Sequence, residues 1–216
     1  MIPLSPSSGI KKFPTFVFYF IGGLWFIHLG LLFLPLDKEL LLAHVDFSET
    51  SDITIRRYIL FCPFFSPHIF SLLINSLFLW TFLPKCLEKH GYWKVFLGSY
   101  FAMSFAITLY AYLLAQPGTR LLAPETFVAA VLGVAMRDEI WESTTTLVPG
   151  HWGLRIFDVP SYVLLFFYLF YNFISHLLMK APYESAPMPY FLPLIAFLAA
   201  FAFSSLPFFK REPESD

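Results

Sequence analysis

Six long apolar stretches, separated by shorter polar connections, dominate the hydrophobic pattern of this 216-residue chain. A helix needs about 20 mainly apolar residues to cross the hydrocarbon core of a bilayer. The pattern therefore predicts an all-α, polytopic membrane protein with a single transmembrane domain over residues 1–216. Its six predicted spans cover residues 14–35, 68–83, 94–115, 121–136, 160–179 and 189–209.

The fourth predicted span is short, and its length suits a helix buried inside a bundle rather than one that faces lipid. Pro124 stands near its start and Glu125 follows, where a carboxylate stabilises the N-terminal end of a helix dipole. The carboxylates as a group fall in connections and are expected to be solvated. Residues 137–159 are expected to form a polar loop.

The composition agrees with a membrane protein. The chain is 57% hydrophobic and 13% charged, whereas soluble proteins carry about 25% charged residues. Aromatic residues make up 20% of the chain, and we expect them on lipid-facing surfaces and at the membrane interfaces. The net charge of −1, without a basic cluster, argues against a nucleic-acid partner. The expected partners are lipids and other membrane protein subunits.

The distribution of Lys and Arg predicts the orientation. With six spans, nine of the 14 Lys and Arg residues fall on the side that holds both termini and the connections at 83–94 and 137–159. The other five fall on the opposite side. Because basic residues are retained on the cytosolic or matrix side, both termini are expected there. The mitochondrial inner membrane and the endoplasmic reticulum are the two alternative intracellular membranes.

Polar side chains inside the spans need partners within the protein, because hydrocarbon offers none. Asn75 lies in the middle of the second span, so we expect that helix to be central in the bundle. Asn172 and His176 lie one turn apart on the fifth span and are expected to bond to neighbouring helices, or to act as a functional pair. His28 is expected to be a neutral imidazole, with proton handling as the alternative. The residues expected to face inward are Asn75, His68, Glu88, His28, Asn172 and His176.

The chain shows no motif for catalysis, a metal or a cofactor. Its histidines are scattered over different spans and loops, without a pair at metal-ligand spacing on one helix. Cys62 and Cys86 would lie about 36 Å apart at the helical rise, too far for a disulfide. A small transporter or channel would predict inverted repeats, and we find no internal repeat. We therefore expect neither a metal ion nor a cofactor.

The second apolar stretch resembles the second transmembrane helix of the rhomboid superfamily. In that family an Asn begins an apolar run, which is followed by a Leu-Glu pair and then a Gly. The residues that carry this resemblance are Asn75, Leu79, Trp80, Phe82, Leu87, Glu88 and Gly91. The resemblance implies a core of six helices with both termini on the inner side of the membrane.

The same resemblance implies that catalysis has been lost. Rhomboid proteases cleave peptide bonds with a serine at the start of the fourth span and a histidine on the sixth. Alignment of the fourth span places Val128 at the nucleophile position, and valine has no hydroxyl to acylate. Ser71 stands where the family has a histidine on the second span, and His68 lies nearly on the opposite face. The sixth span has no histidine.

We therefore expect a catalytically inactive, rhomboid-like integral membrane protein, not an enzyme, that serves as a structural or accessory subunit of a larger membrane complex. The first alternative is an adaptor in membrane protein quality control, similar to the Derlins. The second is an active intramembrane serine protease with a displaced nucleophile such as Ser71 or Ser104.

Overall fold

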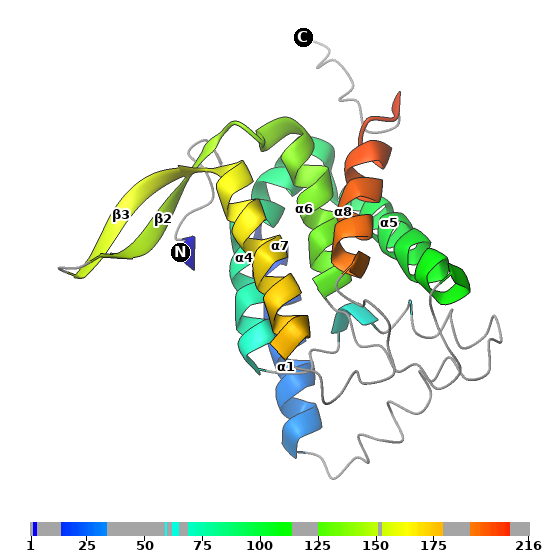
Figure 1. Cartoon of the computed structure of the whole chain (residues 1–216), viewed down its shortest axis with the longest axis horizontal. Coiled ribbons are helices and arrows are strands. Elements are labelled where there is room, and N and C mark those ends of the chain that lie inside the picture. The colour runs from blue at the N-terminus through cyan, green and yellow to red at the C-terminus, as the bar shows by residue number, and fades with distance from the viewer. Residues whose placement is uncertain are drawn as a thin grey trace.

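The computed structural model of the chain describes residues 2–3, 14–33, 59, 62–64, 69–113, 125–150, 153–178 and 191–207. Within these residues the protein is mostly helical, and its helices form one bundle (Figure 1). The helices are α1 (Thr15–Phe33), η1 (Cys62–Phe64, a single 3₁₀ turn), α4 (Ile69–His90), α5 (Tyr92–Leu113), α6 (Glu125–Glu139), α7 (Ser161–Leu178) and α8 (Phe191–Phe203).

Helices α1, α4, α5, α6, α7 and α8 confirm the helical segments that the apolar pattern predicts, although several boundaries differ. Helix α4 does not end at Pro84 but continues through it to His90. Gly91 follows the helix; it has a φ of 79° and donates its N–H to the Leu87 carbonyl at 2.9 Å. This is a left-handed C-terminal cap, a conformation that glycine adopts without steric cost. Helix α8 ends at Phe203, where Ser204 donates its hydroxyl to the Phe201 carbonyl at 2.7 Å.

The all-α expectation is confirmed only in part, because the described residues are mostly helical but include strands, and the expectation of a polar loop at 137–159 is wrong. Strands β2 (Ser143–Gly150) and β3 (Gly153–Pro160) form an antiparallel hairpin that projects from the bundle (Figure 1). Strand β1 (Ile2–Pro3) pairs with β2, so the sheet has the order β1-β2-β3. The hairpin forms because Thr144–Thr146 and Val148 are β-branched and favour extended backbone, and only two residues join the strands.

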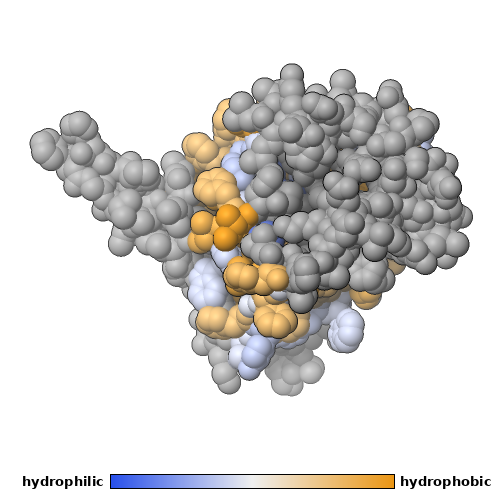
Figure 2. All heavy atoms as spheres, turned by 90° about the horizontal axis from the view of Figure 1, so that it is seen from below, coloured by the Kyte–Doolittle hydropathy of each residue, from blue (hydrophilic) through white to orange (hydrophobic). Residues whose placement is uncertain are grey.

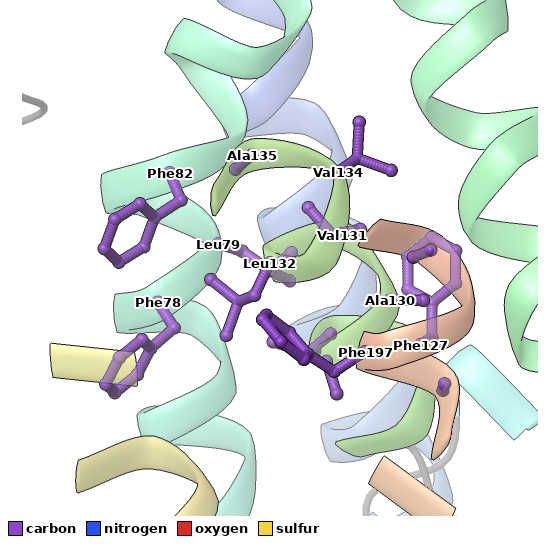
Figure 3. Close-up of a cluster of buried hydrophobic side chains, with 14 of the residues drawn as sticks. Phe78, Leu79, Phe82, Phe127, Ala130, Val131, Leu132, Val134, Ala135 and Phe197 are labelled. Atoms are coloured by element: carbon purple, nitrogen blue, oxygen red, sulfur yellow. The ribbon is translucent and has the colours of Figure 1, made fainter. Parts of the chain in front are cut away.

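Helix α6 is the centre of the bundle. Every side chain from Glu125 to Met136 is buried, as the short fourth span predicts. Helix α6 contacts α4, α5, α7 and α8, and apolar side chains of α4, α6 and α8 meet in one cluster (Figure 3). The labelled members are Phe78, Leu79, Phe82, Phe127, Ala130, Val131, Leu132, Val134, Ala135 and Phe197.

The approach of α6 to α8 requires a residue without a side chain at position 133. A Cβ added to Gly133 would overlap the Phe197 carbonyl oxygen and lie 2.8 Å from Ala200 Cβ and 3.1 Å from Phe201 N. Small residues allow membrane helices to approach this closely, and backbone packing then contributes to their association. Gly133 therefore sets the distance between the two helices.

Among the described residues, two helices, α4 and α5, are long and apolar enough to cross a membrane, by length and composition alone. The bundle also exposes large apolar side chains, some of them on the face seen in Figure 2. Those on the outside of α1, α5 and α7 include Phe18, Phe26, Phe101, Phe105, Phe166 and Phe170.

Candidate functional site

A buried polar cluster joins α4, α6 and α7. Ser71 donates its hydroxyl to Glu125 Oε1, and Asn75 Nδ2 lies 3.5 Å from the Ser71 oxygen. Tyr168 donates its hydroxyl to Asn75 Oδ1 at 3.0 Å, with the Glu125 backbone carbonyl as a second acceptor at 3.3 Å. All four residues are buried. Hydrogen bonds between buried side chains thus connect three helices that are distant in the sequence.

The local structure explains how the cluster forms. Ser71 and Asn75 are four residues apart on α4 and therefore lie on one face of it. Glu125 is the first residue of α6, where its carboxylate also faces the positive end of the helix dipole. Tyr168 reaches the cluster from the middle of α7, and its aromatic ring packs against Phe78 with 4.7 Å between the ring centroids. Asn75 faces inward, as the sequence predicts.

A small cavity lies beside this cluster. Its volume is about 10 Å³, close to the least that one water molecule needs. Asn75 and Val128 both contribute to its wall, so the predicted nucleophile position and the inward amide line the same cavity. The lining residues are Leu24, Pro63, Phe64, Leu72, Asn75, Leu79, Phe127 and Val128. Only the Asn75 amide in this lining can donate a hydrogen bond from its side chain, and no lining residue carries a nucleophile.

Two further buried oxygens stand at the start of α6. Glu125 Oε2 and the Thr126 hydroxyl have no hydrogen-bond partner within the part of the chain that the structure describes. Only 4% of the surface of Glu125 is exposed, so the expectation of a solvated carboxylate is wrong at this residue. The sequence does not indicate that Glu125 is buried, because this burial results from the approach of α4 and α7 to the first turn of α6.

Comparison with known proteins adds no family assignment. No protein-family model, curated protein or solved structure matches this chain. The resemblance to rhomboids therefore stays a prediction that rests on the residues of the second apolar stretch.

Of the other polar residues predicted to face inward, His28 and Asn172 are buried and Glu88 is exposed. His28 is buried on α1. Asn172 is buried on α7, where its amide donates to the Tyr168 carbonyl of the same helix at 2.9 Å. Glu88 is exposed in the last turn of α4, so its predicted inward position is wrong: α4 continues past Pro84 and carries Glu88 to the end of the bundle. His68 and the side chain of His176 lie outside the described residues.

The described residues offer no metal site made of three or more His, Cys, Asp or Glu side chains. Ser104, the other serine considered as a nucleophile, donates its hydroxyl to the Tyr100 carbonyl of its own helix at 2.6 Å. Ser71 is the one of these two serines that contacts a carboxylate. The chemistry available in the cluster is therefore that of a carboxyl group, an amide and hydroxyl groups in an apolar surrounding.

Proposed function

We propose that this chain is a catalytically inactive, six-span membrane protein with a rhomboid-like bundle, and that it acts as a structural or accessory subunit of a larger membrane protein complex. The observation that carries this proposal is the cavity wall, which includes both Val128 and Asn75. A rhomboid protease would need a hydroxyl nucleophile at this place and an imidazole to deprotonate it. The described lining provides neither.

The contacts at one end of the bundle support the six-span arrangement. Strand β1 pairs with β2, and Lys85 near the end of α4 forms an ion pair with Glu142 just before the hairpin. The start of the chain, the α4–α5 connection and the α6–α7 connection therefore lie together. This is the grouping expected if each helix crosses the membrane once, with both termini on the basic, cytosolic or matrix side. The mitochondrial inner membrane and the endoplasmic reticulum are the two candidate membranes.

The exposed aromatic residues on α1, α5 and α7 support contact with lipid acyl chains or with neighbouring spans, because a soluble monomer rarely exposes large contiguous apolar patches. The hairpin gives the bundle an extension outside the helices through which another subunit can be bound (Figure 1).

Purification of the full chain from its native membrane in a mild detergent tests the subunit proposal. The expected result is a complex of fixed stoichiometry, much heavier than the 24.9 kDa chain, with other membrane proteins identified by mass spectrometry. Co-purification of protein-degradation enzymes instead would favour the adaptor similar to Derlins. Recovery of the chain alone, from several mild detergents, would contradict both.

A second candidate function, peptide hydrolysis by Ser71, is favoured by one contact. Ser71 donates its hydroxyl to Glu125 Oε1, and a carboxylate can accept the proton of a serine nucleophile. A fluorophosphonate probe separates the two functions, since it labels activated serines covalently. The subunit proposal expects no labelling of the purified complex, while a known serine hydrolase added to the same detergent is labelled. Labelling that Ser71→Ala removes and Ser104→Ala retains would establish the hydrolase.

A further inference from the structure

Strand β3 forms one edge of the three-stranded sheet. The sheet order is β1-β2-β3, and β3 pairs with β2 from Gly153 to Pro160 in consecutive register, without a bulge. The hairpin projects away from the helices (Figure 1), and β1 lies on the opposite side of β2 from β3. The outer side of β3 is therefore left open by the strands that the structure describes.

Two prolines show which backbone groups of β3 point to this open side. In an antiparallel pair, residues that exchange N–H and C=O bonds alternate with residues that do not. Proline has no N–H, so Pro149, which pairs with Leu154, and Pro160 both belong to the second kind. Their pairs are an even number of steps apart along the ladder, as the alternation requires. The N–H and C=O groups of Leu154 and Ile156 therefore point away from β2.

The other edge of the sheet is protected against further pairing. Strand β1 covers part of the outer edge of β2, and both Pro3 of β1 and Pro149 of β2 lack an N–H. Natural proteins use prolines and bulges in this way to prevent an edge from accepting a foreign strand. Strand β3 has neither a proline nor a bulge before Pro160. Of the two edges, β3 is thus the one that can accept another strand.

The spacing of the outward groups determines what can bind them. Alternate residues of a strand repeat their N–H and C=O groups about every 6.8 Å. A second extended backbone carries acceptors and donors at the same spacing, whereas a helix uses its own groups internally and a lipid headgroup has no such repeat. We propose that β3 binds an extended segment of a partner subunit, which joins the sheet as a fourth strand through hydrogen bonds to Leu154 and Ile156.

This inference rests on the proposed function, because it names the surface with which the subunit binds its partner. The sheet already contains a strand from a distant part of the chain, since residues 2–3 pair with residues 146–147. A short extended segment is therefore enough to pair with this hairpin, and the partner needs no folded domain at this place.

Hydrogen exchange of single backbone amides in the purified complex tests the proposal, with the chain expressed alone as the reference. In the chain alone, the amides of Leu154 and Ile156 should exchange fast, whereas those of Arg155 and Phe157, which donate to β2, should exchange slowly. In the complex, exchange at Leu154 and Ile156 should slow about tenfold or more, because a bonded amide exchanges only when its hydrogen bond opens. Equal exchange at these two residues in the complex and in the chain alone would overturn the proposal.

The variant Ile156→Pro tests the same edge by mutation. It removes an outward donor and places the proline ring on the open side, but it removes no hydrogen bond to β2. Recovery of the partner with the tagged chain should fall about tenfold or more, since a lost hydrogen bond and a steric clash both weaken binding. Ile156→Val keeps the N–H and should leave recovery unchanged. Slow exchange at Arg155 and Phe157 in Ile156→Pro would show that the hairpin is intact.

The possible results separate this inference from the proposed function. A complex that Ile156→Pro leaves intact would contradict the inference alone, whereas the absence of any complex with the wild type would contradict both. Protection of Leu154 and Ile156 in the chain purified alone, together with a doubled mass, would show that a second copy occupies the edge. That result would also overturn the inference.

Discussion

Replacing Gly133 by leucine is expected to separate α6 from α8 and to lower the free energy of unfolding by about 3 kcal/mol or more, the upper part of the range for overpacked cores. The first atom of the new side chain already meets the Phe197 carbonyl oxygen, with Ala200 Cβ at 2.8 Å and Phe201 N at 3.1 Å. Two of these three atoms belong to the backbone of α8, so rotation of a side chain cannot make room. Unfolding in detergent, followed by circular dichroism against denaturant, measures the loss.

Gly23→Leu is the matched control, because a Cβ at Gly23 in α1 has no heavy atom within 4 Å. This identical substitution is expected to change the free energy of unfolding by no more than about 0.5 kcal/mol, or to raise it. The reason is that leucine is more favourable than glycine in a helix by close to 1 kcal/mol. A loss at Gly133 no larger than that at Gly23 would contradict the close packing of α6 against α8.

The second large effect is expected from Tyr168→Phe. This variant keeps the ring contact with Phe78 but removes the hydroxyl that donates to Asn75 Oδ1. A buried acceptor left without its donor costs about 1–3 kcal/mol. Tyr112→Phe removes a hydroxyl from a residue of α5 that is 68% exposed, and its effect should stay within about 0.5 kcal/mol.

A double-mutant cycle with Asn75→Leu assigns the effect to the hydrogen bond. If Tyr168 acts through Asn75, Tyr168→Phe should cost less in the Asn75→Leu background, with a coupling of about 0.6–2 kcal/mol, as measured for interhelical bonds in membranes. If the losses in free energy of unfolding of the two variants are strictly additive, Tyr168 and Asn75 do not interact. The polar cluster would then not link α4 to α7.

The apolar pattern could predict the helices, because hydropathy depends mainly on local sequence, and the short length of the fourth span predicted that α6 is buried. The central position, which was expected for the second span, belongs to α6. The apolar pattern also predicted the inward direction of Asn75, since an amide in an apolar helix has nowhere else to bond. The pattern did not predict the hairpin, because a stretch with Thr144–Thr146 and few apolar residues reads equally as a loop. Nor did it predict that α4 runs through Pro84, since Pro normally interrupts a helix, whereas membrane helices tolerate it when their neighbours satisfy the freed backbone groups.

The candidate site was predicted only in part. Asn75, predicted to face inward, and Val128 line one cavity. The partners of Asn75, namely Ser71, Glu125 and Tyr168, depend on how three helices pack together, and residue spacing on one helix carries no information about that. Glu125 in particular has the sequence signature of an ordinary helix-capping acid, and only the tertiary structure distinguishes it from a solvated one.

Lipid exposure of spin labels tests the account most directly. Single cysteines at positions 101, 166 and 132, in a chain whose Cys62 and Cys86 are alanine, would carry nitroxide labels in proteoliposomes. Phe101 and Phe166 are 66% and 62% exposed, and Leu132 of α6 is 1% exposed. A membrane-embedded bundle around α6 predicts that labels at 101 and 166 collide with oxygen dissolved in lipid far more often than with a water-soluble nickel chelate, and that the label at 132 collides with neither. Frequent collisions of the labels at 101 and 166 with the chelate would contradict the membrane assignment on which the proposed function depends.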